Sequence, residues 1–336
     1  MKKVVLLNDT TYDNHYGCDL VVRSIEHLVT KHNGTLVAKI PFYTNWEKSK
    51  STQNKIKKCD AVIVNGEGSL HSGNMYWLAT ISKFCKQHNK KVYLVNSIYQ
   101  NNPKYYQEYL ALFDRISVRE SYSHNELTKI GIHSTIVPDL SFYNHGQQSK
   151  AVQNKDLDNH KIYFSDSTIE SASEDLSLLN SVGNILNIRY YKFFRFNLKT
   201  PAFESIRANL LMNLKNLLCM KKRKSLSLRN EDLFIQKIVS SDLIISGRFH
   251  LICLAIKHQK AFIPYKTNTF KIKALLQDVF GSINQPPPID KNNIDDFLKN
   301  YVLNNQEKMA QYTTEANRKI EYFFEKIMAD IGSKSI

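Results

Sequence analysis

The chain has 336 residues, which is enough for two domains that each bury a complete sheet. Its 42% hydrophobic and 23% charged residues are typical of a soluble globular protein, and no apolar run approaches the roughly 18 residues of a membrane-spanning helix. The odd number of scattered cysteines argues against a disulfide framework or a zinc site, and we expect neither a metal nor a cofactor.

The N-terminus carries two lysines, but only four apolar residues follow them before Asn8 and Asp9. A signal peptide needs an apolar stretch of about 7 to 15 residues. The segment therefore predicts the first strand of a cytoplasmic protein.

Apolar segments that are typical of strands and of helices alternate along the chain. In the first part we expect strands at 4–8, 35–40, 61–65, 92–97, 115–118 and 135–137, with helices at 18–31, 74–88, 103–112 and 121–130. In the second part we expect strands at 161–164, 185–189, 243–246 and 261–264, with helices at 171–181, 231–240, from 251 onward, at 271–277 and at 305–328.

This alternation predicts parallel, doubly wound sheets and an α/β fold. We expect an N-terminal α/β domain at 1–145, a polar linker at 146–160, a C-terminal α/β domain at 161–290 and a helical segment at 291–336. The fold class is therefore two Rossmann-like domains that face each other across a cleft.

One construction occurs twice, at 59–66 and at 241–247: a polar residue and an aspartate lead into a short aliphatic run that stops at a glycine. Each copy predicts a buried parallel strand that ends in a tight turn. Because ligands in open α/β sheets bind at the carboxyl ends of strands, the two copies predict two half-sites. This layout is more typical of an enzyme than of a scaffold.

The first copy continues into a glycine turn in which Gly66 and Gly68 flank Glu67, followed by Ser69 and His71. Such a turn lifts a carboxylate off the strand end and exposes backbone N–H groups to an anion. The alternative is an ordinary turn whose glutamate faces solvent.

The second copy, with Ser246 and Gly247, continues into Arg248 and His250. Arginine can bind a carboxylate or phosphate through two parallel hydrogen bonds, and histidine can donate a hydrogen bond or act as an acid. The alternative is a structural role for both residues.

Further candidates follow other expected strands, and each has an ordinary turn or helix cap as its alternative. Asp139 and Ser141 lie just beyond the strand at 135–137. Arg119 follows the strand at 115–118. Asn14 and His15 precede the first helix.

Residues 186–230 carry eleven basic residues against one acid, Glu204, and are interleaved with aromatic and aliphatic side chains. This composition suits the surface of an anionic membrane, although a solvated helical face would show it too. The segment contains no recognisable nucleic-acid motif, so we expect no nucleic acid as a partner.

Taken in order, these motifs resemble those of the polysaccharide pyruvyl transferase family over most of residues 1–280. The resemblance implies a fold like that of the GT-B glycosyltransferases, and transfer of a pyruvyl group from phosphoenolpyruvate to sugar hydroxyls of cell-envelope glycans. It places Arg248 and His250 at the anionic groups of the donor, with Glu67, Asp139 or His250 as acid and base.

The acidic Glu67, together with Asp139 and Ser141, also resembles retaining glycosyltransferases that move Kdo from CMP-Kdo, with Asp139 as the nucleophile. A third alternative is a basic glycan-binding protein without enzymatic activity. The leading prediction is a cytoplasmic transferase, peripheral at the inner membrane, whose acceptor is a lipid-linked or polymeric glycan.

Overall fold

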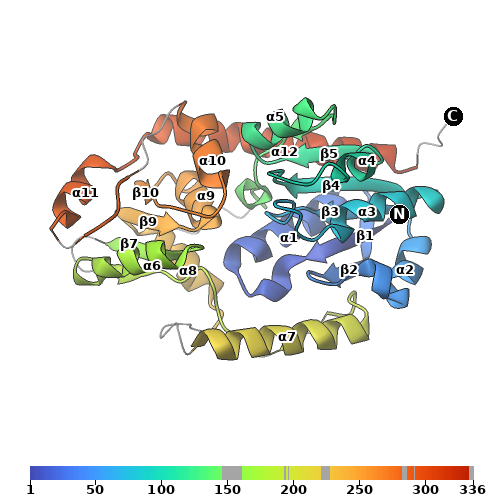
Figure 1. Cartoon of the computed structure of the whole chain (residues 1–336), viewed down its shortest axis with the longest axis horizontal. Helices are drawn as coiled ribbons and strands as arrows, with labels where there is room; N and C mark the ends of the chain where they lie inside the picture. Colours follow the sequence, from blue (N-terminus) through green and yellow to red (C-terminus); the bar gives the residue numbers. More distant parts are fainter. Residues whose placement is uncertain are drawn as a thin grey trace. The chain divides into compact units, whose positions relative to one another are not determined.

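The computed structural model describes residues 1–145, 161–192, 194–195, 197–220, 228–281, 286–290 and 292–332. The chain forms two compact units, each assembled from separated stretches of sequence (Figure 1). The first unit comprises Met1–Leu140, Lys192–Lys224 and Arg318–Ile336, and the second comprises Ser141–Tyr191 and Ser225–Asn317. The expected division into consecutive domains differs from this one, because part of the basic segment and the end of the chain group with the first unit. The expected linker at 146–160 lies outside the described residues.

The first unit contains a parallel sheet in the order β2-β1-β3-β4-β5-β6. Its strands are β1 (Lys2–Asp9), β2 (Gly34–Pro41), β3 (Ala61–Asn65), β4 (Lys91–Ser97), β5 (Arg115–Val118) and β6 (Thr135–Ile136). Its helices are α1 (Tyr16–Lys31), α2 (Lys50–Lys57), α3 (Trp77–Gln87), α4 (Tyr106–Leu110), α5 (Ser121–Lys129) and α7 (Ala202–Met220). Each of the six strands expected in this part of the chain is present.

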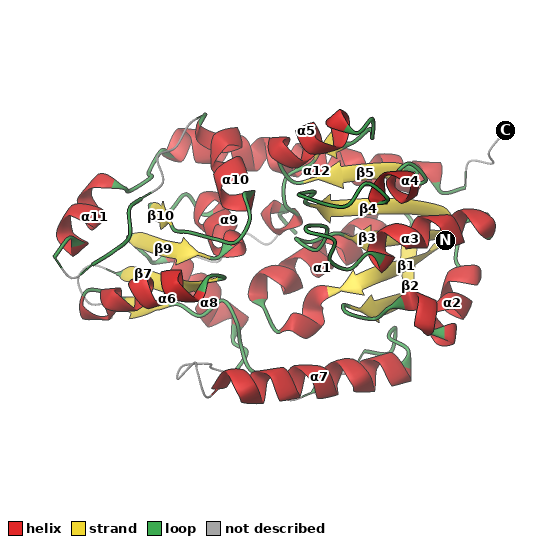
Figure 2. Ribbon diagram, viewed as in Figure 1, coloured by secondary structure: helices red, strands yellow, loops and turns green. Residues whose placement is uncertain are grey.

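The second unit contains a parallel sheet in the order β10-β9-β7-β8. Its strands are β7 (Ile162–Ser167), β8 (Asn184–Ile185), β9 (Leu243–Gly247) and β10 (Phe262–Pro264). Its helices are α6 (Glu170–Ser177), α8 (Glu231–Val239), α9 (Phe249–Lys257), α10 (Lys271–Phe280) and α11 (Ile294–Asn300), and the long α12 (Gln306–Asp330) has residues in both units. Figure 2 shows the strands and helices of each unit by colour.

Several expected elements are shorter than predicted, among them α4, which spans Tyr106–Leu110 instead of 103–112. The helix expected from residue 74 begins only at Trp77, because Ser72, Gly73 and Met75 have positive φ angles of 54°, 74° and 49°, which a right-handed helix cannot contain. The strand expected at 185–189 is the two-residue β8.

The repeated sequence construction makes the same contacts in both units. In the first unit, Lys3 N–H donates to the Asp60 carboxylate at 2.7 Å while Asp60 N–H donates to the Lys3 carbonyl at 2.8 Å. In the second, Lys161 and Asp242 exchange the same two hydrogen bonds at 2.8 and 3.0 Å. Each aspartate thus aligns the start of one buried strand with the start of its neighbour, which explains why it precedes the apolar run.

The glycines that end the two copies lie against a serine of a neighbouring strand. A Cβ atom on Gly66 would be 2.5 Å from Ser97 Cβ, and one on Gly247 would be 2.5 Å from Ser167 Cβ. Both distances are shorter than van der Waals contact, so only glycine allows the backbones to approach this closely. The strand ends on either side of each glycine are therefore held together tightly.

In both sheets the order in which strands are added reverses at the strand next to the repeated construction. β1 lies between β2 and β3, and β7 lies between β8 and β9, so the chain winds outward in both directions from β1 and from β7. The carboxyl ends of strands at such a switch point are where ligands bind in open α/β sheets. The candidate sites are therefore the ends of β1 and β3, and the ends of β7 and β9.

Candidate functional site

At the carboxyl ends of β1 and β3, hydrogen bonds hold the Glu67 side chain in place. Glu67 Oε2 accepts a hydrogen bond from Asn65 Nδ2 at 3.1 Å and another from Thr10 Oγ1. Asn65 is itself fixed across the switch point, because Asn8 Nδ2 donates to its carbonyl at 2.6 Å. The half-buried Glu67 is thus an oriented carboxylate rather than a glutamate that simply faces solvent.

The glycine turn lies against a buried arginine. Gly68 has a φ of 65°, in the left-handed region that glycine tolerates, and a Cβ there would be 3.6 Å from Arg119 Nη2. The Glu67 turn and Arg119 therefore belong to one cluster at this edge of the sheet.

Arg119 is paired with Asp139 inside the unit. Arg119 Nη1 donates to Asp139 Oδ2 at 2.8 Å, and the two side chains are 2% and 0% exposed. Arg119 directly follows β5 and Asp139 follows β6, the neighbouring strand, so the parallel pairing of these strands brings the two together. The structure thus brings into contact two residues that the sequence analysis predicted as separate site candidates.

The structure describes the remaining candidates of the first unit mainly through their backbones. Asn14 has a left-handed φ of 50° and His15 occupies the N-cap position of α1, where its side chain makes no capping hydrogen bond. Ser69 N–H donates to the Gly66 carbonyl at 2.8 Å, which closes the glycine turn, and the His71 backbone pairs with Gln100.

Ser141 belongs to the second unit rather than to the cluster around Asp139. Its buried backbone carbonyl accepts a hydrogen bond from Lys257 Nζ at 2.9 Å. This contact positions the start of the second unit against α9.

In the second unit, Arg248 caps the start of α9 directly after β9, and an aspartate holds its guanidinium group. Arg248 Nε donates to Asp166 Oδ1 at 2.6 Å, and Nη2 donates to Oδ2. The two residues stand at the ends of adjacent strands, β9 and β7. Arg248 is therefore fixed in a bidentate ion pair with Asp166 at the switch point.

The other residues of the second half-site support this arrangement. Ser246 Oγ lies 2.6 Å from Ser165 Oγ and accepts a hydrogen bond from Arg248 N–H at 2.9 Å. His250 follows in the first turn of α9 and is buried. The structure thus brings Ser246, Gly247, Arg248 and His250 to one strand end.

Sequence reasoning missed several residues that hold the two half-sites. Their common signal was a polar residue at or just after the end of an expected apolar strand, a signal that we applied to only some of the strands. These residues are Asn8, Thr10, Asn65, Ser97, Ser165, Asp166 and Ser167.

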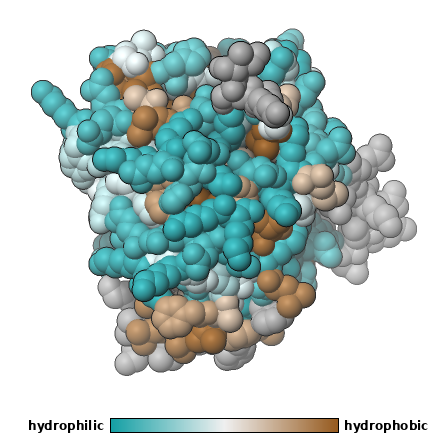
Figure 3. Space-filling view, turned by 90° about the vertical axis from the view of Figure 1, so that its right-hand side faces the viewer, coloured by the Kyte–Doolittle hydropathy of each residue, from teal (hydrophilic) through white to brown (hydrophobic). Residues whose placement is uncertain are grey.

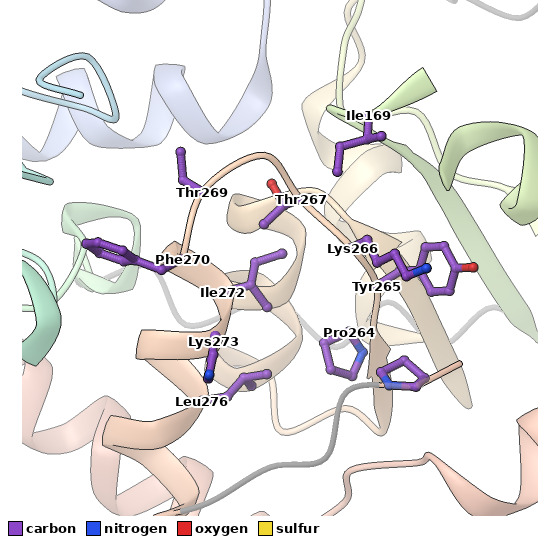
Figure 4. A pocket seen from close by; sticks show the side chains of 11 residues that line it. Ile169, Pro264, Tyr265, Lys266, Thr267, Thr269, Phe270, Ile272, Lys273 and Leu276 are labelled. Atoms are coloured by element: carbon purple, nitrogen blue, oxygen red, sulfur yellow. The ribbon is translucent and has the colours of Figure 1, made fainter. Parts of the chain in front are cut away.

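A pocket of about 270 Å³ adjoins the second half-site (Figure 4). The Lys266 carbonyl, on its wall, would be 2.7 Å from a Cβ on Gly247 and accepts a hydrogen bond from Ser167 Oγ. Burial and a hydrogen bond to Asp175 raise the pKa of Tyr265, so its hydroxyl stays protonated and anchors the loop. The side chains that line the pocket belong to Ile169, Pro264, Tyr265, Lys266, Thr267, Thr269, Phe270, Ile272, Lys273, Leu276 and Pro286.

Comparison with known proteins identifies the fold. A UDP-GlcNAc 2-epimerase from Neisseria meningitidis, solved with UDP-GlcNAc bound, is similar at a TM-score of 0.55, with 12% identity over 98% of this chain and 100% of that one. A Listeria monocytogenes protein described as a UDP-N-acetylglucosamine 2-epimerase is similar at 0.57, with 10% identity over 99% and 97%. Together with the parallel sheets of the two units, these similarities confirm the predicted GT-B-like α/β fold.

The sequence comparisons identify the family. No curated protein sequence matches the chain. The family model for polysaccharide pyruvyl transferase, in contrast, matches residues 15–269, which contain both glycine turns, the Arg119–Asp139 pair and Arg248. Because this match covers well over half of the sequence, the chain is a transferase that belongs to the polysaccharide pyruvyl transferase family.

Proposed function

We propose that this transferase moves a pyruvyl group from phosphoenolpyruvate onto the hydroxyl groups of a bacterial surface polysaccharide, forming a ketal that carries a carboxylate. The observation that best supports the donor is the guanidinium group of Arg248, oriented at a strand switch point in a member of this family. The second unit is then the donor side, and the first unit is the acceptor side.

Arg248 is suited to an anionic donor because only one edge of its guanidinium group is occupied. Nε and Nη2 bind Asp166, whereas no described residue accepts a hydrogen bond from Nη1. The Nη1 amino group can therefore bind the carboxylate or phosphate of the donor while Asp166 keeps the plane of the group fixed. His250, two positions after Arg248 in the first turn of α9, supplies a second donor or an acid.

The chemistry needs one acid and one base. An acid protonates C3 of phosphoenolpyruvate, which becomes a methyl group, and C2 becomes an electron-poor, oxocarbenium-like centre. One sugar hydroxyl adds to C2 and loses its proton to a base. A second hydroxyl then displaces phosphate, which departs with the proton of that hydroxyl. Glu67 and His250 are the candidates for these proton transfers, and Glu67 is held for the task by Thr10 and Asn65.

The burial of Asp139 favours this reaction over Kdo transfer. As a nucleophile, Asp139 would have to reach an anomeric carbon, but its side chain is 0% exposed and ion-paired with Arg119. Pyruvyl transfer makes no such demand, since Asp139 then only has to hold Arg119 in place.

We further propose that the enzyme acts at the cytoplasmic face of the inner membrane on a lipid-linked or polymeric glycan. The basic composition of residues 186–230 supports an anionic surface as a partner. Within the described residues no helix is long and apolar enough to span a bilayer, so such an association would be peripheral.

Thermal unfolding with each donor tests the assignment. Phosphoenolpyruvate at about 100 times its dissociation constant should stabilise the protein by about 2.7 kcal/mol, and a ten- to hundredfold weaker affinity in Arg248→Lys should reduce that protection to about 0.4 to 1.4 kcal/mol. CMP should have no effect. Protection by CMP, or a sugar adduct on Asp139 in intact-protein mass spectra after incubation with CMP-Kdo, would overturn the proposal.

A further inference from the structure

Helix α7 turns its apolar side away from the protein. Five of its exposed side chains are large and apolar: Phe203, Ile206, Leu210, Leu211 and Leu214 have exposed fractions of 72%, 53%, 66%, 47% and 57%. Its buried face contains the polar residues Glu204, Ser205 and Asn209 beside Ala208 and Met212, which pack with Tyr12. A surface helix of a globular protein normally exposes its polar side chains and buries its large apolar ones.

Specific contacts within the first unit hold α7 in this orientation. Ser205 Oγ lies 3.1 Å from the Tyr12 hydroxyl, and Glu204 accepts a hydrogen bond from Ser49 Oγ. Asn209 Nδ2 donates to the Arg195 carbonyl at 2.9 Å. Since a rotation of the helix would break all of these contacts, its apolar side is fixed outward.

The segment that precedes α7 is also attached to the first unit. Lys39 N–H donates to the Lys199 carbonyl at 3.0 Å, and Lys199 Nζ forms an ion pair with Glu26 at 2.6 Å. Leu198, between these contacts and the helix, is 89% exposed. The loop and the helix thus present one apolar surface, which we call the α7 stripe: Leu198, Phe203, Ile206, Leu210, Leu211 and Leu214.

The stripe is contiguous along the helix. Phe203, Ile206, Leu210 and Leu214 are separated by three or four positions, a spacing that lines up side chains on one face over about 16 Å. In Figure 3, apolar residues form a band along the lower edge of the molecule, where α7 lies in Figure 1.

The charge of this part of the sequence indicates what covers the stripe. Residues 186–230 contain eleven basic residues and one acid, Glu204, which faces inward and is 4% exposed. Arg207, in contrast, is exposed between Ile206 and Leu210. An apolar stripe with positive charge beside it complements an anionic lipid surface, whereas a second copy of the chain would bring like charges together.

We propose that α7 lies in the plane of an anionic membrane, with the α7 stripe inserted among the lipid headgroups and Arg207 at the level of the phosphates. This proposal builds on the proposed site of action at the membrane. It assigns the contact with the membrane to one face of α7.

Co-sedimentation with vesicles tests the proposal. The protein should bind vesicles of phosphatidylglycerol and phosphatidylcholine more tightly than vesicles of phosphatidylcholine alone, and added salt should weaken that binding. Leu210→Ser combined with Leu214→Ser should lower the affinity about tenfold or more. Arg207→Glu should weaken binding to the anionic vesicles selectively.

The matched control is Leu233→Ser combined with Val239→Ser, which removes two exposed aliphatic side chains from another helix, α8. It should bind vesicles as the unmodified protein does. The proposal would be overturned if both double variants lost the same vesicle affinity, or if the α7 variant bound vesicles as tightly as the unmodified protein. It would also be overturned if the unmodified protein were a dimer and the α7 substitutions alone made it a monomer. Protection by phosphoenolpyruvate should persist in the α7 variant, so a failure of the proposed function would be seen separately.

Discussion

Arg119 and Asp139 form an ion pair that is almost completely withdrawn from solvent, with Nη1 and Oδ2 2.8 Å apart and side chains 2% and 0% exposed. Breaking such a pair from one side leaves a charge buried without compensation, which costs far more than the pair itself contributes. The pair also lies under the Gly68 turn, so its loss would disturb the surroundings of Glu67.

Asp139→Asn should therefore lower the free energy of unfolding by about 3 to 5 kcal/mol, measured by urea denaturation. Asp60→Asn is the control, because Asp60 is exposed and the side-chain amide oxygen of the asparagine could still accept the hydrogen bond from Lys3 N–H. That variant should lose less than about 1 kcal/mol. If the two variants lost similar free energies of unfolding, the burial of the Arg119–Asp139 pair would not add to the cost of breaking it.

Arg248→Lys should lower kcat/KM for phosphoenolpyruvate by about ten- to a hundredfold, because lysine cannot bind Asp166 and the donor in a fixed plane. Arg229→Lys provides the comparison, since Arg229 pairs with Glu231 at 2.8 Å outside the half-site. We expect steady-state kinetics of that variant to match those of the unmodified enzyme. An active Arg248→Lys enzyme would assign Arg248 a structural role.

Glu67→Gln should slow pyruvyl transfer by about a hundred- to ten-thousandfold while leaving thermal protection by phosphoenolpyruvate intact, because it removes a proton-transfer group but not the donor site. Glu47→Gln is a close control: like Glu67, Glu47 accepts two side-chain hydrogen bonds, in its case from the hydroxyls of Tyr76 and Thr80 at 3.3 and 2.8 Å. Unchanged turnover in Glu67→Gln would remove Glu67 from the mechanism.

The Thr10 hydroxyl should matter to the same step. Thr10→Val removes the hydrogen bond to Glu67 and should lower turnover, because Asn65 alone then orients the carboxylate. Thr10→Ser retains a hydroxyl and should restore turnover. If valine and serine behave alike, Thr10 does not position Glu67.

Stability should fall in mild acid because of His258. Burial, with Lys257 and Lys260 nearby, lowers the pKa of His258 from 6.5 to about 4. Between these values the unfolded chain binds a proton that the folded chain does not, so stability is complete above pH 6.5 and declines as the pH falls toward 4, by up to about 3 kcal/mol. In urea denaturation at pH 7 and pH 5, His258→Gln should show a clearly smaller loss than the unmodified protein. An equal loss would exclude His258 as the cause.

The amino-acid sequence by itself determined the strands and the positions of the half-sites. A strand buried on both faces of a parallel sheet is apolar along its length, and the close approach of the backbones at its end requires glycine. The sequence therefore shows β3 and β9 as short aliphatic runs that stop at Gly66 and Gly247. Glu67 and Arg248 were found because they follow those glycines directly.

Only the tertiary structure decided which side chains meet. Asp166 lies 82 positions before Arg248 in the sequence, and no local pattern links them; the pairing of β7 with β9 does. The orientation of α7 has the same origin. Periodicity predicts that the side chains of a helix divide between two sides, but not which side packs. Here Tyr12 and Ser49, far away in the sequence, hydrogen-bond Ser205 and Glu204 on the side that also buries Ala208 and Met212, and the large apolar side chains of the opposite side are exposed.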